Sequence, residues 1–379
     1  MTAYDADVAV VGLGAMGSSA LWRLAERGVD VVGFERFRPG HVQGSSHGHT
    51  RLFRVACLEH PSLVPFAQES LRLWRILQER GGTPIIDITG GLMIGAPDSE
   101  VVTGTLAAAR EHDLPVRTLT AGELATEYPQ HTEVPADHVA VWDPMAGVVR
   151  PEAGVVAACA AAEAAGAKVY TDTRVLGVEL VAGGVAVTTP VRTFLVRQAV
   201  VTAGAWLGSL VPELPLEPVR TPMTWFRART PGEFDIARFP VFVRGLADDT
   251  WFWGHGAIDG LDVKVGPDQD PNFYPVDPDQ VDRGVSPADF ALVSDLVARA
   301  LPGLEPVPSR TTTCMITRSP DGMFQLGRPR DDPRLVVGGG CSGHAFKHAP
   351  AIGEFLAQLT VGEPTLVEPD FVDPNRFLR

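Results

Sequence analysis

Three glycines near the N-terminus have the spacing that a dinucleotide requires. Gly12, Gly14 and Gly17 form the pattern Gly-x-Gly-x-x-Gly, and Glu35 follows Gly17 by 18 residues. The first glycine permits a tight turn, the second lets the backbone approach a pyrophosphate, and the third lets a helix pack closely on a strand. The Glu35 carboxylate can accept hydrogen bonds from ribose hydroxyls and disfavours a 2′-phosphate. The spacing predicts a bound dinucleotide other than NADP, and a glycine-rich turn without a ligand is the alternative.

The residues around the glycines supply the strand–helix–strand unit that the motif needs. Residues 7–11 are a short apolar run, typical of a buried parallel strand. A helical pattern of apolar residues follows and ends at Gly28, and a second strand is expected over 29–35. Because the helix begins at the glycines, its N-terminus would favour the negative charge of the phosphates.

The rest of the chain mixes helical patterns with strands of two kinds. Helices are expected at 62–80, 100–111, 152–166 and from Pro350 onward. The expected strands are 85–86, 91–95, a hairpin of 168–181 and 185–189 around Gly183 and Gly184, and the runs 198–206 and 335–340. The last two runs enter small residues, as if they end beside a ligand. Residues 215–320 alternate instead, which predicts an antiparallel sheet.

Composition and charge exclude several classes of protein. The 379 residues carry a net charge of −14, which argues against nucleic acid or an anionic membrane as a partner. No apolar run is long enough to span a membrane, and the N-terminus lacks the pattern of a secretory signal. The four cysteines are far apart with no Cys-x-x-Cys, so neither a disulfide framework nor a metal site is expected. These features predict a cytoplasmic globular protein of two or three domains.

Three more residues are candidates for chemistry. Only three of the 32 basic residues are lysines, so a retained lysine is enriched where a compact ammonium is needed. Lys264 alternates with apolar residues and could point into the interior, and Lys347 precedes the last helix. From the spacing alone, Cys314 is more often an inert buried thiol, and a lone lysine more often lies on a solvated surface.

Four further motifs resemble one known family. They are Gly-Ser-Ser-His-Gly-His-Thr-Arg-Leu-Phe-Arg at 44–54, Ala-Gly-Ala-Trp at 203–206, Thr-Cys-Met-Ile-Thr-Arg-Ser-Pro-Asp at 313–321 and Gly-His-Ala-Phe-Lys at 343–347. With the glycine fingerprint, and in order along nearly the whole chain, they are similar to the monomeric sarcosine oxidase and N-methyltryptophan oxidase branch of the FAD-dependent D-amino-acid-oxidase-like superfamily. The resemblance implies a flavoprotein oxidase of secondary amino acids that releases hydrogen peroxide.

The resemblance also implies the domain organisation. The fold class is α/β, with a Rossmann-like FAD-binding domain in three segments and an antiparallel-sheet substrate domain. The FAD-binding domain is expected over 1–82, 150–212 and 325–379. The substrate domain is expected over 83–149 and 213–324.

Individual roles follow from the same resemblance. Cys314 would bind FAD covalently through the 8α-methyl carbon of the flavin, and Arg51 would lie beside the ring. Arg54 and Lys347 would clamp the substrate carboxylate. Lys264 would activate O₂, because a fixed ammonium stabilises the negative charge that forms on oxygen. The residues expected to contact FAD are Gly12, Gly14, Ala15, Met16, Gly17, Glu35, Arg36, Ser46, Thr50, Arg51, Val175, Gly204, Cys314, Met315, Gly343, His344 and Lys347.

The substrate pocket departs from the family pattern. Asp268, or Asp270 if the loop has shifted, stands where sarcosine-specific members carry a histidine, and Trp253 stands where a tyrosine is usual. Ile316 and Cys57 likewise replace aromatic residues. An acid near the amine favours a cationic or imine-tautomer substrate, and a relative that oxidises a cyclic imino acid in an antibiotic pathway carries an Asp in this region. The pocket is expected to take a larger or cyclic secondary amino acid.

Two other functions share the glycine fingerprint. An NAD-linked dehydrogenase would need no role for Cys314. A non-catalytic FAD-binding protein would need neither Lys264 nor Lys347. The resemblance favours a monomer whose partners are a small amino acid and O₂.

Overall fold

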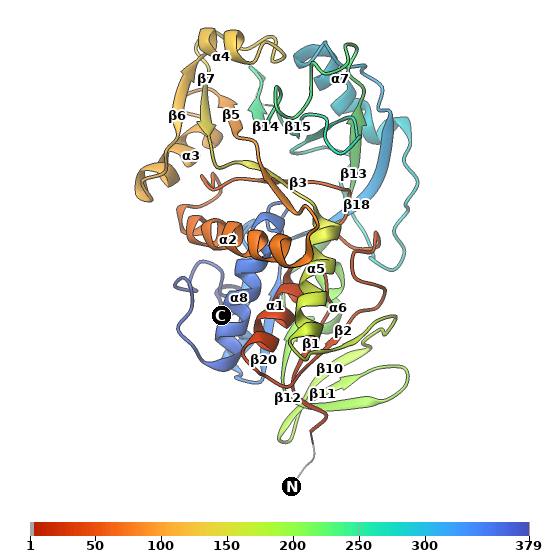
Figure 1. Ribbon diagram of the computed structural model, residues 1–379. Helices are drawn as coiled ribbons and strands as arrows, with labels where there is room; N and C mark the ends of the chain where they lie inside the picture. The colour runs from red at the N-terminus through yellow and green to blue at the C-terminus, as the bar shows by residue number, and fades with distance from the viewer. Residues whose placement is uncertain (1–3, 249, 379) are drawn as a thin grey trace.

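The computed structural model describes residues 4–248 and 250–378, with one large sheet at each end of an elongated molecule (Figure 1). The first sheet contains β1 and lies at the lower end of the molecule in Figure 1. Its strand order is β10-β11-β12-β1-β2-β9, with β20 beside β12 and β19 beside β20. These strands are β1 (Ala6–Val11), β2 (Val31–Phe34), β9 (Lys168–Tyr170), β10 (Gly177–Val181), β11 (Gly184–Thr188), β12 (Thr193–Val201), β19 (Gln325–Gly327) and β20 (Leu335–Gly339).

The centre of this sheet confirms the predicted strand–helix–strand unit. β1 pairs in parallel with β2 and β12, and β12 pairs in parallel with β20. α1 (Ala15–Glu26) begins at the glycine motif. Since parallel strands end at the same edge of a sheet, the glycine-containing loops after β1, β12 and β20 meet at one edge, where open α/β sheets bind ligands.

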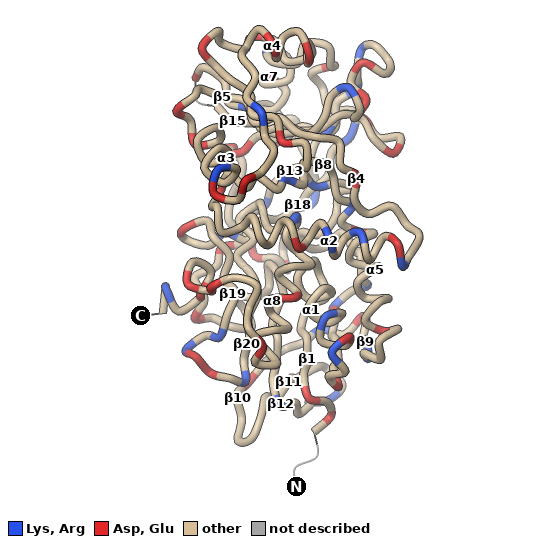
Figure 2. The backbone as a smooth tube through the Cα atoms, turned by 60° about the vertical axis from the view of Figure 1, so that its left-hand side comes forward, with Lys and Arg blue, Asp and Glu red and all other residues tan. Residues whose placement is uncertain are grey.

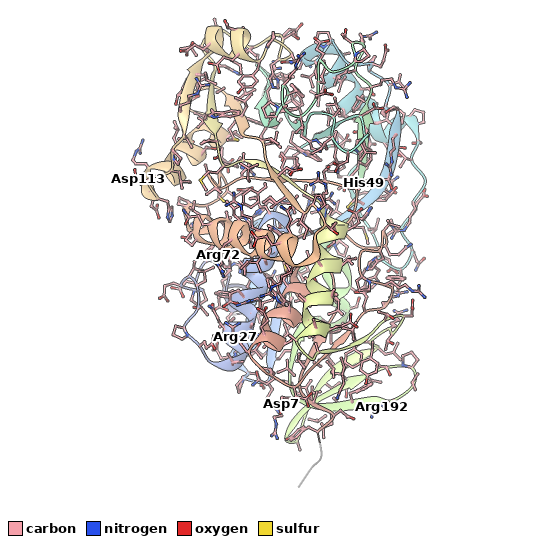
Figure 3. All side chains as sticks on the ribbon, in the orientation of Figure 1. Asp7, Arg27, His49, Arg72, Asp113 and Arg192 are labelled. Atoms are coloured by element: carbon pink, nitrogen blue, oxygen red, sulfur yellow. The ribbon has the colours of Figure 1, made fainter. Side chains whose placement is uncertain are left out.

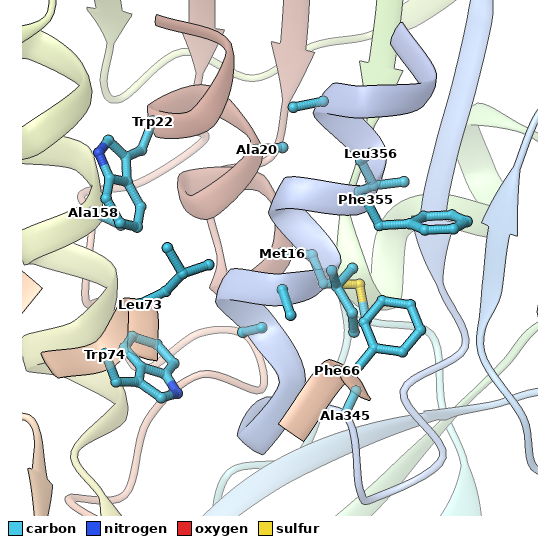
Figure 4. Packing of buried hydrophobic residues seen from close by; sticks show 14 of the residues in the cluster. Met16, Ala20, Trp22, Phe66, Leu73, Trp74, Ala158, Ala345, Phe355 and Leu356 are labelled. Carbon is cyan, nitrogen blue, oxygen red and sulfur yellow. The ribbon is translucent and has the colours of Figure 1, made fainter. Parts of the chain in front are cut away.

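Four helices beside this sheet pack on one another and bury the apolar faces that the sequence predicts (Figure 4). They are α1, α2 (Val64–Gly81), α5 (Pro151–Ala164) and α8 (Ala349–Val361). Met16 of α1, Phe66 of α2 and Phe355 of α8 belong to one core cluster. A Cβ on Gly353 would overlap the backbone of α1, so α1 and α8 cross in close contact only because that residue is glycine.

The second sheet has the order β17-β13-β16-β15-β14-β5-β7-β6, with β18 beside β13. Its strands are β5 (Gly91–Gly95), β6 (Arg117–Thr120), β7 (Val139–Asp143), β13 (Glu217–Phe226), β14 (Val241–Gly245), β15 (Trp251–His255), β16 (Val263–Pro267), β17 (Tyr274–Pro275) and β18 (Arg310–Arg318). It is antiparallel as predicted, except that β14 pairs in parallel with β5. The α/β sheet and this sheet together confirm the predicted fold class.

Smaller elements complete the chain. A three-stranded sheet in the order β3-β8-β4 is formed by β3 (Arg51–Phe53), β8 (Gly147–Val149) and β4 (Ile86–Ile88). The other α-helices are α3 (Glu100–Glu111), α4 (Ala121–Glu127), α6 (Leu207–Leu210) and α7 (Ala291–Ala300). β3 matters most for the site, because it follows the 44–50 loop and lies between the two ends of the molecule (Figure 1).

One strand expectation is wrong in its extent. The alternation predicts a single strand over 168–181, but the structure divides it into β9, which pairs in parallel with β2, and β10, which pairs with β11. Between them Asp172 has a φ of +50°, a left-handed conformation that breaks an extended strand. The N–H groups of Asp172 and Thr173 donate to backbone carbonyls of the segment after β2. Local alternation could not reveal this pairing with a distant strand.

Charged residues of both signs are interspersed along the chain trace (Figure 2). Within the described part of the chain, no helix is both long and apolar enough to cross a membrane. The same residues contain no group of three His, Cys, Asp or Glu side chains placed to hold a metal ion.

Candidate active site

A cavity of about 620 Å³ lies between the two large sheets. Its walls at one end are the loops after β1, β2, β12 and β20, and at the other end β13, β15, β18 and the residues after β16. Small-molecule and cofactor pockets range over roughly 300–1,000 Å³, so this cavity has room for a large ligand.

The glycine end of the cavity has the geometry of a phosphate cradle. Gly12 has a φ of +88°, and a Cβ on Gly17 would overlap the carbonyl oxygen of Gly12. Both positions therefore require glycine. Gly14 is the N-cap of α1 and carries no side chain to cap the helix. The N–H of Ala15 donates to Oγ of Ser46 at 3.1 Å, and the N–H groups that follow it in the first turn remain available to an anion. These observations fit the pyrophosphate of FAD.

Glu35 lies just after β2 and lines the cavity. Its Oε2 accepts from the N–H of Leu13 and its Oε1 from the N–H of Phe37, each at 2.9 Å. Burial by itself raises the pKa of this carboxyl, but His41 and the backbone donors outweigh burial and hold the pKa below its usual value. A charged, oriented carboxylate at this position fits the ribose hydroxyls that the fingerprint predicts.

Most residues that the sequence analysis assigns to FAD or substrate line this cavity. They are Gly12, Gly14, Ala15, Met16, Glu35, Arg36, Ser46, Arg51, Arg54, Val175, Gly204, Trp253, Asp268, Cys314, Met315, Gly343, His344 and Lys347. Gly17, Thr50 and Lys264 are buried behind its wall instead. Of the two acids that the sequence left open, Asp268 lines the cavity, whereas Asp270 is buried and accepts from the N–H of Asn272 at 2.7 Å.

Cys314 lies on β18 where the cavity meets the antiparallel sheet. Its Sγ is 3.6 Å from Nη2 of Arg51. The same guanidinium donates to the carbonyl oxygens of Ser45 at 2.9 Å and Thr50 at 2.8 Å. Cys341 also lines the cavity, but its Sγ accepts from the N–H of Thr317 at 3.4 Å. The two thiols therefore differ in their neighbours, and an arginine lies beside Cys314.

Arg54 and Lys347 converge on one carboxylate, that of Glu59. Nη2 of Arg54 lies 2.7 Å and Nζ of Lys347 lies 2.8 Å from Oε1 of Glu59. Lys347 also donates to the carbonyl oxygen of His344 at 3.1 Å. The fold thus joins two cations from opposite ends of the sequence around a carboxylate that the sequence analysis did not select.

This cluster retains unused hydrogen-bonding capacity. Nε and Nη1 of Arg54 and Oε2 of Glu59 are buried, and none has a hydrogen-bond partner among residues 4–248 and 250–378. Most buried polar atoms in proteins are paired, so unpaired ones indicate a missing ligand or water. The free donors of Arg54 line the cavity and suit a second carboxylate, one that a ligand would supply.

The charges of the cluster leave one cation in excess. Burial would raise the pKa of Glu59, but Arg54 and Lys347 outweigh burial and hold that pKa well below its usual range. Burial, followed by repulsion from Arg54, lowers the pKa of Lys347, and Glu59 opposes this shift. With all three groups ionised, the cluster has a net positive charge, which favours an anionic ligand.

Lys264 is almost completely buried on β16, with 1% of its surface exposed. Its Nζ donates to the carbonyl oxygens of Gly48 at 2.8 Å and Thr50 at 3.0 Å, and lies 4.9 Å from the ring centre of Trp225. Burial, with a smaller contribution from Arg51, lowers the pKa of Lys264 well below its usual value. The lysine therefore points inward, beneath the loop that carries Arg51 to the cavity.

Two indoles form the apolar wall beyond the cation cluster. Trp251 and Trp253 lie two residues apart on β15, and both line the cavity with Val243. The ring of Trp253 lies against Gly266, where a Cβ would be 2.6 Å from it. The side chain of Asp268, which follows β16, keeps contact with solvent, and partial desolvation by the surrounding protein raises its pKa. This end of the cavity is thus aromatic and carries one acid that is protonated more readily than usual.

Buried histidines should make the protein sensitive to acid. Burial lowers the pKa of His47 and His255 to about 3 and that of His344 to about 4, compared with roughly 6.5 in an unfolded chain. Below the unfolded pKa the unfolded chain binds protons that the folded chain does not, so the free energy of unfolding falls as the pH falls. We expect a loss on the order of 1 kcal/mol per pH unit per histidine between about pH 6 and pH 4.

Urea unfolding followed by tryptophan fluorescence at a series of pH values measures this dependence. The midpoint should fall steadily from about pH 7 to about pH 5, where most carboxyl groups do not yet titrate. A midpoint that stays constant over this interval would show that the three imidazoles are accessible and titrate normally.

Several residues of the site were not selected from the sequence. Glu59 lies five residues after Arg54 in the same segment, but a single glutamate carries no pattern. Trp225 and His255 lie on different strands from Lys264, and only the sheet register places them beside it. Its closeness in sequence to Arg54 is the one signal that points to Glu59, and many other charged residues lie as close to a motif.

Comparisons with known proteins agree with this geometry. The chain is 34% identical over 376 residues to a monomeric sarcosine oxidase of Streptomyces avermitilis, covering 98% of this chain and 97% of that protein. It is 30% identical over 374 residues to an N-methyl-L-tryptophan oxidase of Yersinia pestis, covering 98% and 100%. Among solved structures, NikD, an unusual amino acid oxidase essential for nikkomycin biosynthesis, superposes with a TM-score of 0.84 at 26% identity, over 97% of both chains.

A more distant structure shares the fold alone. L-Proline dehydrogenase from P. horikoshii has a TM-score of 0.84 at 22% identity, over 100% of this chain and 99% of that one. The family model described as DAO, FAD dependent oxidoreductase, matches residues 7–359. With the phosphate cradle, the ribose-side carboxylate and matches over nearly the full length, this chain belongs to the DAO family of FAD-dependent oxidoreductases.

Proposed function

We propose that this chain is an FAD-dependent oxidase of a secondary amino acid, either N-methylated or cyclic, that uses O₂ as acceptor. The observation that carries the proposal is the convergence of Arg54 and Lys347 at one point of a cavity whose other end is a dinucleotide cradle. The names of the relatives support it, since they describe oxidases of sarcosine, of N-methyl-L-tryptophan and of an unusual amino acid.

FAD would supply the redox chemistry, by accepting two electrons and a proton from the C–H bond beside the substrate nitrogen, which loses its own proton, and by passing two electrons to O₂, which takes up two protons. The residues of the chain would orient the substrate and set the charge around it. Arg54 and Lys347 would bind the substrate carboxylate through charge-assisted hydrogen bonds, and this anchor would hold the amine in a reactive position. Released imine would hydrolyse in water, and O₂ would leave as hydrogen peroxide.

The Glu59 carboxylate competes with the substrate carboxylate for Arg54 and Lys347. It already accepts a hydrogen bond from each cation, so an incoming carboxylate must share or replace those bonds. One unpaired donor of Arg54, Nε or Nη1, together with the second N–H of Nη2, can bind a second carboxylate while the first N–H of Nη2 keeps Glu59. Arg54 would thereby connect the protein carboxylate and the substrate carboxylate.

The aromatic wall supports a substrate larger than sarcosine. The cavity has an apolar surface beyond the anchor, formed by Trp251, Trp253, Val243 and Ile316. A substrate whose only apolar group is a methyl would cover little of this surface and so would gain little binding energy from it. Asp268, with its raised pKa, would accept a hydrogen bond from the substrate amine or donate one to it, according to its protonation. The best substrates are therefore expected to carry a ring or a large apolar side chain.

We also propose that Cys314 holds FAD covalently, and that the α/β segments bind FAD while the antiparallel sheet supplies the substrate wall. The support is the position of the Cys314 thiol on the cavity wall beside Arg51. An electron-poor flavin edge in the cavity, next to this buried wall thiol, would permit a thioether bond.

Flavin that remains with the acid-precipitated polypeptide tests this proposal. The purified protein should be yellow, and the colour should stay with the pellet. In Cys314→Ser the colour should move to the supernatant, because FAD would then be held only by noncovalent contacts. Cys341→Ser is the matched control and should keep the colour in the pellet. A colourless native protein would exclude a flavoprotein oxidase, and loss of covalent flavin in Cys341→Ser but not in Cys314→Ser would reassign the thiol.

A further inference from the structure

The turn above Lys264 has a strained backbone. Gly48 has a φ of +96° and His49 a φ of +65°, and a residue other than glycine is uncommon in this region. The turn nonetheless directs two carbonyl oxygens, those of Gly48 and Thr50, toward Nζ of Lys264. Because the strained turn would relax if it were free, side chains must hold it in place.

Three side chains, those of Glu152, Arg310 and His255, hold this turn. Oε1 of Glu152 accepts from the N–H groups of Gly48 at 2.7 Å and His49 at 3.1 Å. His49, labelled in Figure 3, pairs with Arg310 through Nε2 at 2.8 Å. Thr50 pairs through Oγ1 with Nε2 of His255 at 2.7 Å, and both of these residues are about 1% exposed. The carbonyl oxygen of Thr50 accepts hydrogen bonds from both Lys264 and Arg51. The contact with His255 is the one that holds Thr50 through its own side chain.

The hydrogen bonds of His255 determine its tautomer. Nδ1 lies 2.7 Å from the carbonyl oxygen of Gly256, and a carbonyl oxygen can only accept, so Nδ1 carries the proton. Burial and the neighbouring Lys264 hold the pKa of His255 to about 3, which keeps the ring neutral. Nε2 is therefore an acceptor, and the hydroxyl of Thr50 donates to it.

The sheet register places His255 directly beside Lys264. Lys264 pairs with Trp225 of β13 on one side and with His255 of β15 on the other, and side chains of directly paired residues lie on the same face of a sheet. The ammonium thus lies in a row between an indole and an imidazole. Among the described residues, no carboxylate lies within ion-pair distance of Nζ, so neutral groups alone fix a positive charge at this point.

We propose that His255 and Thr50 are positioning residues for Lys264. The neutral imidazole accepts the Thr50 hydroxyl and holds the 48–50 turn, and the carbonyl oxygens of that turn hold the ammonium in the place where it acts on oxygen. This inference rests on the proposed oxidase function. It adds that the rate of flavin reoxidation depends on a hydrogen bond that touches neither FAD nor substrate.

The test compares the reaction of reduced flavin with O₂ in five single variants and in the double variant that combines Thr50→Val with His255→Phe. Thr50→Val removes the hydroxyl donor but keeps nearly the same side-chain shape, and Thr50→Ser keeps the hydroxyl. His255→Phe removes the imidazole nitrogen that accepts the hydrogen bond. Lys264→Met is the reference, and Thr360→Val is the matched control, because the buried Thr360 hydroxyl donates to a carbonyl within α8 and lies outside the cavity. Holoenzyme is reduced with dithionite under nitrogen and mixed with aerated buffer, so no substrate is needed.

We expect Thr50→Val and His255→Phe each to slow reoxidation by about threefold to tenfold, the change that the loss of one hydrogen bond gives. The double variant should be no slower than either single variant, since both remove the same bond. Thr50→Ser and Thr360→Val should react like the wild type. Anaerobic reduction by N-methyl-L-tryptophan or sarcosine, whichever reduces the wild type, should change by less than about twofold.

Hydrogen–deuterium exchange provides a readout independent of activity. The peptide that spans 45–53 should exchange faster in Thr50→Val and His255→Phe, and at the wild-type rate in Thr50→Ser and Thr360→Val. Wild-type reoxidation in Thr50→Val, with slow reoxidation in Lys264→Met, would overturn this inference and leave the proposed function intact. Fast reoxidation in Lys264→Met would instead remove the oxygen role itself. Equal slowing in Thr50→Val and Thr360→Val would show that the hydroxyl serves stability alone.

Discussion

Replacing Lys264 by Met is expected to slow the reaction of reduced flavin with O₂ by about two to three orders of magnitude, the effect of removing one preorganised group that stabilises developing charge. Electron transfer to O₂ creates negative charge, and the ammonium of Lys264 is buried, oriented by two carbonyl oxygens and lacks an ion-pair partner in the described residues. Met keeps the length of the side chain and removes the charge. Stopped-flow absorbance of the flavin after mixing with O₂ measures the rate.

Anaerobic reduction by substrate separates the two half-reactions. It should change by less than about threefold in Lys264→Met, because the carboxylate anchor is formed by other residues. Lys168→Met is the control, since Lys168 is exposed on β9, and neither rate should change. Lys264→Arg should restore only part of the rate, because a planar guanidinium spreads its charge and fills more space. Equal slowing of both half-reactions in Lys264→Met would refute an oxygen-specific role.

Replacing Arg54 by Gln should lower kcat/KM for an amino acid substrate by about two to four orders of magnitude. Two hydrogen bonds from a charged donor are worth about 3–6 kcal/mol, and each 1.36 kcal/mol or so of transition-state binding is tenfold in rate. The same change should affect an amine without a carboxylate much less. The measurement is peroxide release from an N-methyl amino acid and from the corresponding N-methyl amine.

The ratio of these two activities is the decisive quantity. The wild type should prefer the amino acid strongly, and Arg54→Gln should lose most of that preference. If the two substrates lose activity in equal proportion, Arg54 supports the structure of the site rather than the carboxylate.

Glu59→Gln tests the same anchor in the opposite direction. Removal of a carboxylate that occupies Arg54 and Lys347 should strengthen the binding of carboxylate ligands and lower KM. It should also destabilise the ligand-free protein, because two buried cations would lose their partner. Added acetate should then raise the melting temperature of Glu59→Gln more than that of the wild type.

Much of the fold could be predicted from the sequence because its signals are local. The glycine spacing after residues 7–11 and the acid at Glu35 predict the strand–helix–strand unit, since each glycine satisfies a backbone requirement within the same segment. The helices after residues 62 and 100 follow from apolar periodicity in the same way. Where pairing depends on distant strands the prediction was wrong, as with residues 168–181, or missed a feature, as with the parallel pair of β5 and β14.

In the candidate site, too, some residues could be predicted from the sequence, whereas their arrangement could not. The resemblance to a known family indicated Cys314, Arg54, Lys347 and Lys264, and a thiol, a fork of donors and a rare compact ammonium suit the chemistry that it implies. It did not indicate that Glu59 lies between the two cations. It also did not indicate that Asp268 rather than Asp270 lines the cavity, since the two differ only in the course of the loop after β16.

By itself, the amino-acid sequence determined which groups are available: the backbone of a phosphate cradle, a carboxylate for a ribose, two cations, a thiol and a buried ammonium. Tertiary structure alone decided which of them act together, because hydrogen bonds and Coulomb interactions act over a few ångströms whereas the groups are separated by hundreds of residues. The register of β13, β16 and β15 places Trp225, Lys264 and His255 in one row. Burial in that row then sets their protonation, and no property of an isolated segment could have set it.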